Sequence, residues 1–227
     1  MSDEQENTIK ETAVGKLLGM NFFIPGYQRG YRWTEQQVND LLNDINEFEP
    51  ENGSWYCLQP LVVKKTIEKW EVIDGQQRLT TIYLILACLG VTDKYTIEYE
   101  TRKGSMNFLE NISEKAQSNI DFFYMHKAYK TIEKFFEKED KEQFEKKLLN
   151  NVKFIWYDVG DLDEEKKHNL FGNLNSGKIA LTNAELIKAL FLNKVGTEKG
   201  SEREIQQRLI AEEFDQMERA IREDDFC

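Results

Sequence analysis

The sequence predicts an α+β fold: a small mixed sheet with packed helices, followed by a mainly helical C-terminal part. Two neighbouring segments, 56–64 and 70–73, predict strands joined by a charged turn, and two capping boxes precede apolar residues at helical spacing. Helical patterns dominate the second half. The chain has 227 residues, of which 40% are apolar and 12% aromatic, so it can bury the core of one sizeable domain.

The first elements follow from local signals. Residues 1–8 are polar and acidic and predict a disordered tail, followed by a short helix near 12–18. Thr34-Glu35-Gln36-Gln37 is the first capping box, and it predicts the start of a helix because apolar residues follow at helical spacing. An apolar helix is expected over Leu79–Leu89, with Gly90 as its C-terminal stop.

The later elements are short strands and longer helices. We expect strands at 95–100 and 152–159, an irregular segment at 101–119, and helices at 120–138, 143–149, 164–174, 186–195 and 201–223. We place the core at residues 9–100 and a mainly helical extension that packs on it at 101–227. Because residues 223–227 carry no helix stop, we expect the chain to be a piece of a longer protein.

The charge balance argues against one class of function. A net charge of −11 and a pI of about 4.9 disfavour DNA binding through a broad basic face, although a small basic pocket stays compatible. Lysines near 138 and 146 alternate with glutamates and predict solvated helix faces. The three cysteines lack metal spacing, which predicts reduced thiols in the cytoplasm. The longest apolar run, 82–89, is too short to cross a bilayer, so we expect no membrane partner.

The strongest functional signal is Asp74-Gly75-Gln76-Gln77-Arg78, between a predicted strand and a predicted helix. Gly75 permits a positive φ or a close backbone approach to a ligand, and the helix N-terminus favours phosphate. Arg78 offers a guanidinium fork to phosphate oxygens, and Gln76 and Gln77 can orient a water or hold phosphate. Asp74 can hold Mg²⁺ or accept a proton from an attacking water, as phosphoryl transfer requires. The alternative is a structural turn in which Asp74 only caps the helix.

The second candidate is the loop 25–33, where one proline and two glycines disfavour regular helix. Tyr27, Tyr31 and Trp33 offer faces for stacking a base, while Gln28, Arg29 and Arg32 offer donors to phosphate or to a base edge. The alternative is that the rings pack into the core and the arginines make surface ion pairs. At least one ring is expected in the core.

Two other motifs carry less weight. The segment 172–178 matches the first part of a Walker A loop, but Ile179 stands where Mg²⁺ binding requires serine or threonine, and a helix is predicted before it. We therefore reject a P-loop NTPase. His126 and His168 have no second ligand at metal spacing, so a histidine-based nuclease centre is not expected within this chain.

Three blocks in a fixed order carry a family resemblance: residues 24–33, residues 72–81, and residues 171–188 with Asn175, Lys178 and Glu185. Over roughly residues 10–195 they resemble the N-terminal domain of GmrSD-type restriction endonucleases, whose fold is similar to ParB and sulfiredoxin. One departure is Gln59, which follows Leu58 where many members carry a glycine. That departure bears on the local geometry of the strand.

The resemblance implies hydrolysis of a nucleoside triphosphate at Asp74–Arg78, with Thr80 and Thr81 of the same block at the nucleotide. It also implies that Asn175 and Lys178 approach the nucleotide from across the fold, although Glu185 and Lys188 can equally pair on a structural helix. The implied cofactors are Mg²⁺ and ATP, GTP, CTP or UTP, with the base left open. Cleavage of modified phage DNA would belong to a separate C-terminal HNH-like nuclease domain or subunit.

Three hypotheses follow for the function. The first is an NTPase that regulates restriction of modified DNA. The second is a non-catalytic reader of modified DNA, with the rings of the 25–33 loop stacking on an extruded base. The third is a nucleotide-gated interaction module, in which nucleotide promotes a homodimer or docking of the nuclease domain.

Overall fold

The structure, a computed structural model, describes residues 8–51, 53–112 and 119–160. The helices expected at 164–174, 186–195 and 201–223 therefore lie outside the described residues. The chain divides into two compact units. The first unit comprises Met1–Ile24, Gly30–Glu98 and Gly104–Leu162, and the second comprises Pro25–Arg29, Tyr99–Lys103 and Asp163–Cys227.

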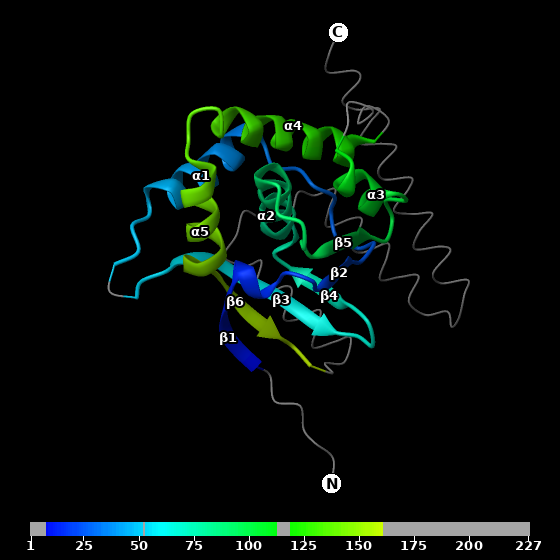
Figure 1. The fold of residues 1–227 in the computed structure, drawn as a ribbon. Coiled ribbons are helices and arrows are strands. Elements are labelled where there is room, and N and C mark those ends of the chain that lie inside the picture. Colours follow the sequence, from blue (N-terminus) through cyan, green and yellow to red (C-terminus); the bar gives the residue numbers. More distant parts are fainter. Residues whose placement is uncertain (1–7, 52, 113–118, 161–227) are drawn as a thin grey trace, which may run out of the picture. The chain divides into compact units, whose positions relative to one another are not determined.

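The strands form one six-stranded mixed sheet (Figure 1). Its strands are β1 (Thr8–Ala13), β2 (Asn21–Ile24), β3 (Tyr56–Lys65), β4 (Trp70–Asp74), β5 (Thr96–Tyr99) and β6 (Val152–Asp158), in the order β1-β6-β3-β4-β2-β5. The pairs β1–β6 and β3–β4 are antiparallel, whereas β2–β4 and β3–β6 are parallel. Together with the helices this sheet confirms the predicted α+β class.

Five α-helices and one short 3₁₀ helix accompany the sheet in the described residues. They are η1 (Val14–Lys16), α1 (Glu35–Glu47), α2 (Gln76–Leu89), α3 (Ser105–Glu110), α4 (Ile120–Phe135) and α5 (Lys141–Asn151). Helices α1, α2, α4 and α5 gather on one side of the strands (Figure 1). Their buried side chains and those of the sheet form the core of the first unit.

Most of the predicted elements within the described residues are confirmed. The two central strands match β3 and β4, and the capping box is complete, because Thr34 Oγ1 accepts from the Gln37 N–H and Gln37 Oε1 accepts from the Thr34 N–H. Helix α2 ends at Gly90 as expected, but it begins three residues earlier, at Gln76. Two expectations were wrong: a strand and a 3₁₀ turn replace the helix near 12–18, and α3 lies within the segment expected to be irregular.

Strand β6 joins the sheet from beyond residue 100. It lies between β1 and β3, and its residues Phe154 and Trp156 are almost fully buried. The parallel pairing with β3 places the late strand in the middle of the sheet, which no local pattern in the sequence indicated. The division of the chain at residue 100 stays a prediction, although the sheet itself extends to residue 158.

The core is built around helix α2 and a cluster of aromatic rings. Every residue of α2 from Leu79 to Leu86 is buried, which explains why its sequence is apolar on nearly all sides. Tyr95 donates a hydrogen bond to the Leu79 carbonyl at 2.6 Å, and its ring packs edge-on against Phe22. Because Phe22 belongs to β2, these contacts hold α2 against the sheet.

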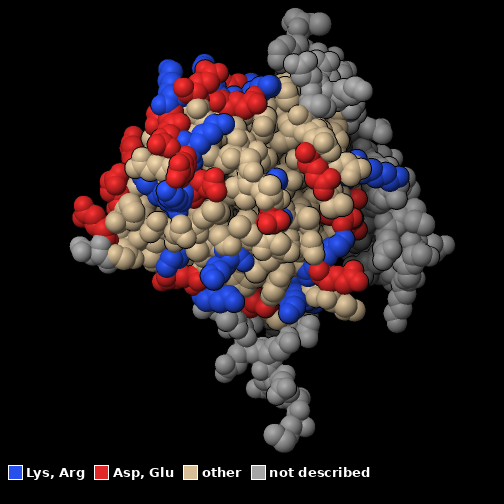
Figure 2. Space-filling view, in the orientation of Figure 1, with Lys and Arg blue, Asp and Glu red and all other residues tan. Residues whose placement is uncertain are grey.

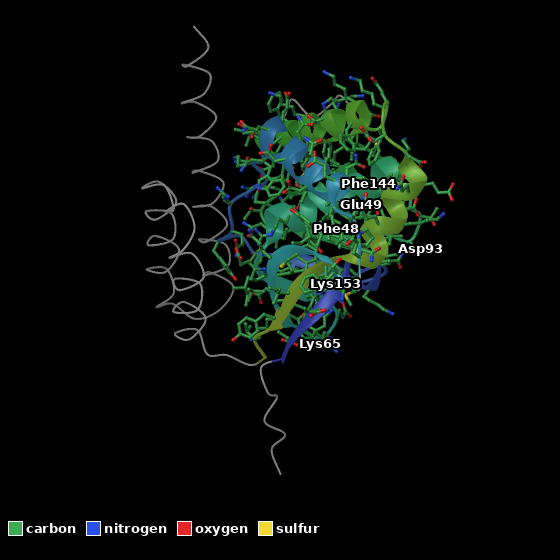
Figure 3. The ribbon with its side chains drawn as sticks, turned by 90° about the vertical axis from the view of Figure 1, so that its left-hand side faces the viewer. Phe48, Glu49, Lys65, Asp93, Phe144 and Lys153 are labelled. Atoms are coloured by element: carbon green, nitrogen blue, oxygen red, sulfur yellow. The ribbon has the colours of Figure 1, made fainter. Side chains whose placement is uncertain are left out.

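The C-terminal end of α1 is held by α5. Lys147 is buried, and its ammonium donates to the Asn46 carbonyl at 2.6 Å and lies 3.6 Å from Glu49. Figure 3 shows Glu49 and Phe48 near Phe144, which lies on the same helix as Lys147. A cation at the end of α1 satisfies a terminal carbonyl and complements the helix dipole.

The exposed faces of the helices carry charges of both signs. Ion pairs join Lys127 to Glu35 at 3.0 Å and Lys146 to Glu142 at 2.8 Å. On the face shown in Figure 2, acidic and basic side chains are intermingled. Lys138 and Lys146 are exposed, so these parts of the glutamate- and lysine-rich runs are solvated surfaces, as predicted, whereas Lys147 is buried.

Replacing Thr34 by alanine is expected to lower the free energy of unfolding by about 1 kcal/mol, because the first turn of α1 loses its cap. Thr131 offers the control, since its hydroxyl donates within α4 to the Lys127 carbonyl and alanine is a better helix former. Thermal unfolding of Thr34→Ala and Thr131→Ala measures both. Equal melting temperatures would contradict a stabilising cap.

Candidate functional site

The turn between β4 and α2 approaches β3 closely. Gly75 has φ +99°, a backbone conformation that residues with a side chain rarely adopt. A Cβ atom added at Gly75 would lie 2.9 Å from Leu61 Cδ1 and 3.1 Å from the Pro60 carbonyl oxygen. Glycine is therefore required both by the backbone conformation and by the contact with β3. The positive φ was expected from the sequence, whereas the close approach to β3 was not.

The first turn of α2 supplies backbone donors next to a carboxylate. The N–H groups of Gln76, Gln77 and Arg78 have no helical carbonyl to bond, and the first helical bond runs from the Leu79 N–H to the Gly75 carbonyl at 3.0 Å. The N-cap residue is Gly75, so Asp74 stands one position earlier than a cap would. Asp74 is the last residue of β4 and is only 9% exposed.

The Arg78 side chain folds back onto β3. Its Nη2 donates to the Pro60 carbonyl at 2.9 Å, and its Nη1 donates to Gln59 Oε1 at 3.1 Å. Asp74 Oδ2 lies 3.9 Å from Nη2, and the Nε of Arg78 is buried with no hydrogen-bond partner among the described residues. Burial lowers the pKa of Arg78, and the Asp74 carboxylate opposes that shift. Arginine pKa values lie so high that the group stays cationic.

Gln59, which Arg78 contacts, stands in an irregular part of β3. Two residues of β3, Leu58 and Gln59, lie between the pairs Cys57–Lys153 and Pro60–Ile155, where β6 has Phe154 alone. This β-bulge gives Gln59 a φ of +66°. A glycine at this position would adopt this backbone without strain.

The Gln77 side chain holds the loop that precedes α1. Its Oε1 accepts from the Arg32 N–H at 2.8 Å, and its Nε2 donates to the Gly30 carbonyl at 2.8 Å. Gln77 is 7% exposed, so the amide binds the backbone of the loop within the protein. Gln76 is also buried, and no hydrogen bond of its side chain is seen among the described residues. The two glutamines therefore differ in their surroundings, which the sequence did not reveal.

Tyr31 connects the same loop to the second turn of α2. Its hydroxyl lies 2.9 Å from Thr81 Oγ1, and Thr81 in turn donates to the Gln77 carbonyl at 2.9 Å. Thr80 donates to the Gln76 carbonyl at 2.8 Å. Tyr31 and both threonines are fully buried, so Tyr31 is the ring of this loop that belongs to the core. Trp33 is half-buried.

Asp121, at the start of α4, is a site neighbour that the sequence did not indicate. Its carboxylate is fully buried and pairs with Arg32 Nη1, which also donates to the Tyr31 carbonyl at 2.8 Å. A Cβ atom added at Gly30 would overlap the Asp121 carboxylate. Any larger residue at position 30 would therefore displace this carboxylate. An aspartate in the first helical turn is ordinarily a surface residue, so no local signal marked it.

The remaining predicted residues belong to the second unit or fall outside the described residues. Tyr27, Gln28 and Arg29 belong to the second unit, where Tyr27 is 43% exposed, Arg29 is exposed and Gln28 is buried. Within that unit the Gly26 N–H donates to Glu100 Oε2 at 2.5 Å. Asn175 and Lys178 lie outside the described residues. The structure therefore brings together Asp74–Arg78, Thr80, Thr81 and Tyr31.

The surroundings of Asp74 limit how a cation would be held. Within residues 8–51, 53–112 and 119–160 there is no cluster of three or more histidine, cysteine or acidic side chains suited to a metal ion. Mg²⁺ commonly binds through one or two carboxylates while substrate phosphates and waters complete its shell. Asp74, next to the donors of α2, fits that mode. A site made of protein ligands alone does not fit these residues.

Gly75→Ala is expected to lower the free energy of unfolding more than Gly19→Ala. Both glycines have positive φ, but a Cβ atom at Gly19 would meet nothing within 4 Å. Gly19→Ala should cost about 1 kcal/mol through backbone strain. Gly75→Ala should cost roughly 1–3 kcal/mol more through overlap with β3. Urea denaturation measures the difference, and equal losses would argue against a tight approach to β3.

Asp121→Ala is expected to lower the free energy of unfolding by about 3–5 kcal/mol, because it leaves Arg32 without its buried partner. Glu142→Ala is the matched control, since the pair of Glu142 and Lys146 is exposed and should contribute less than about 0.5 kcal/mol. Chemical denaturation compares the two variants. Similar small losses would show that the buried pair does not organise the loop.

Comparison with known proteins places the chain in a family. In the residues that the structure describes, no helix has both the length and the apolar character needed to span a membrane. No curated protein matches the chain. The model of the GmrSD restriction endonuclease N-terminal domain matches residues 9–192 and so includes both the loop at 25–33 and the Asp74–Arg78 turn. Because this match covers most of the sequence, the chain belongs to the GmrSD restriction endonuclease N-terminal domain family.

Proposed function

We propose that this domain binds and hydrolyses a nucleoside triphosphate at the Asp74–Arg78 turn, and that hydrolysis regulates cleavage of modified phage DNA. Family membership makes the chain part of a GmrSD-like restriction system. The observation that carries the proposal is the turn itself. It combines a carboxylate, three N–H donors at a helix N-terminus and an arginine whose Nε has no partner in the part of the chain that the structure describes.

The donors of α2 and Arg78 would hold the phosphates. N–H groups in the first turn of a helix point at an anion while the helix dipole favours its charge. Arg78 is tied to Pro60 and Gln59 through two of its five donors, so its charge is fixed in position beside the turn. A fixed charge stabilises the developing charge of a transition state without reorganising.

Asp74 would act on the water. Its carboxylate lies 3.9 Å from Arg78, so the acid stands beside the group proposed to hold phosphate. A carboxylate there can accept the proton of a water that attacks the terminal phosphorus. Asp74 is equally the residue that would hold Mg²⁺, which when bound neutralises charge on the phosphate oxygens. The Gln76 amide, in the first turn, can orient the water or a phosphate oxygen.

The test is phosphate release from ATP, GTP, CTP and UTP with Mg²⁺, using wild type and Asp74→Asn. Asp74→Asn retains the size of the side chain but removes its basicity and charge. Turnover is expected to fall by roughly 10²–10⁴-fold, the range of a positioned acid or base. Arg78→Ala should also abolish turnover. Because Arg78 also bonds β3, the melting temperature of this variant must be compared with that of wild type.

Lys146→Ala serves as the control, since this side chain is 72% exposed on α5 and lies among surface charges. It should retain wild-type turnover. Full activity in Asp74→Asn would exclude the carboxylate from the reaction. No turnover by folded wild type with any of the four nucleotides, with or without glucosylated duplex DNA, would contradict hydrolysis by this domain.

A second candidate function is favoured by the second unit. Tyr27 is 43% exposed and Arg29 is exposed two residues later, which is a combination suited to stacking a base and contacting its phosphate. Such a module would read modified DNA without turnover. Tighter binding to modified than to plain duplex, lost in Tyr27→Ala but retained in Asp74→Asn, would support it.

A further inference from the structure

Gln59 adopts a left-handed backbone conformation, which is unfavourable for glutamine. Among the described residues it is the one non-glycine residue with positive φ, at +66°. A residue with a Cβ atom is strained in this region, whereas glycine is not. Strained residues cluster at functional sites, where the surrounding structure over-determines them. The conformation therefore prompts the question of what the Gln59 side chain does.

The Gln59 side chain is exposed and is used at one end only. Its Oε1 accepts from Arg78 Nη1 at 3.1 Å. Because a guanidinium only donates, chemistry requires the amide oxygen to face Arg78 and the amide nitrogen to face away. No hydrogen bond from Gln59 Nε2 is seen within the described residues. As far as the described part of the chain shows, the two N–H donors of this amide have no protein acceptor and can serve a ligand.

The position of this amide connects it to the Asp74–Arg78 turn. Arg78 touches Gln59 with one nitrogen and lies 3.9 Å from Asp74 with another. The neighbouring Pro60 carbonyl lies against Gly75, the N-cap of α2. The amide therefore lies beside Arg78, the cation of the turn.

We propose that Gln59 is a ligand-binding residue of this site, donating from Nε2 to a phosphate oxygen of the nucleoside triphosphate while Oε1 positions Arg78. The assignment rests on the proposed function. Glycine at this position would relieve the strain but would supply no donor. The bulge in β3 thus carries a side chain into the site where a regular strand with its ordinary pairing would not place one.

Two variants separate the amide from the backbone strain. Gln59→Ala removes the amide and keeps a Cβ atom in the left-handed region, whereas Gln59→Gly removes both. The affinity for a fluorescent nucleoside triphosphate should fall about tenfold in both, as expected for one lost hydrogen bond to a charged group. Gln59→Gly should melt about 2–4 °C above Gln59→Ala, because it alone relieves the strain.

Nucleotide affinity and melting temperature, measured together, exclude a merely structural role of Gln59. If Gln59 acted only through stability, the better-folded Gln59→Gly would bind nucleotide more tightly than Gln59→Ala. Equal losses of affinity, with KM raised and kcat nearly unchanged, support direct contact in the ground state. Wild-type affinity in both variants, or affinity that follows the melting temperature, overturns the assignment of Gln59.

Failure of the proposed function and failure of the Gln59 assignment give different experimental results. If folded wild type binds none of the four nucleotides, the proposed function falls and the assignment of Gln59 falls with it. If wild type binds and hydrolyses nucleotide, if Asp74→Asn abolishes turnover and if both Gln59 variants behave as wild type, only the assignment of Gln59 falls. A loss of affinity for duplex DNA with unchanged affinity for nucleotide also overturns it.

Discussion

The close approach of the Gly75 turn to β3 is the constraint on which the site depends. With the backbone of Gly75 against Pro60 and Leu61, helix α2 begins at the level of the β3 bulge. That position brings Arg78, one turn along, within reach of the Pro60 carbonyl and of Gln59. A side chain at residue 75 would move α2 away from β3 and separate the arginine from these acceptors. The site is therefore assembled by backbone contact first and by side chains second.

A buried polar network also holds the loop before α1 against helix α2. The Gln77 amide bonds the backbone on both sides of Tyr31, while Tyr31 reaches Thr81 one turn along α2. Asp121 closes the network by pairing with Arg32 against Gly30. Polar groups at this depth are stabilising only when each is satisfied, so the network tolerates one arrangement of the loop. The arrangement of the loop is thus coupled to the turn that holds Asp74.

The sequence predicted the local parts of this structure and missed those set by tertiary contacts. The capping box at Thr34 and the glycine at 75 have local causes, namely unsatisfied helix donors and a positive φ. The partnership of Asp121 with Arg32 joins residues 89 apart in the chain, and nothing near Asp121 distinguishes it from a surface acid. Gln59 shows the limit most clearly. A glutamine in a strand carries no sign of a left-handed backbone, and only its place in a family pattern raised the question.

The charge of the chain bears on the choice between a nucleotide and a duplex as direct ligand of the turn. The protein carries −11 overall, while Arg78 and the start of α2 form a small positive region beside one carboxylate. Charges separated by more than about 10 Å are largely screened at moderate salt, so a compact triphosphate would experience mainly this local field. A duplex extends far beyond it and would also experience the net negative charge of the chain. Under the proposed function, electrostatics therefore favours a small phosphate ligand at the turn and leaves contact with DNA to other parts of the restriction system.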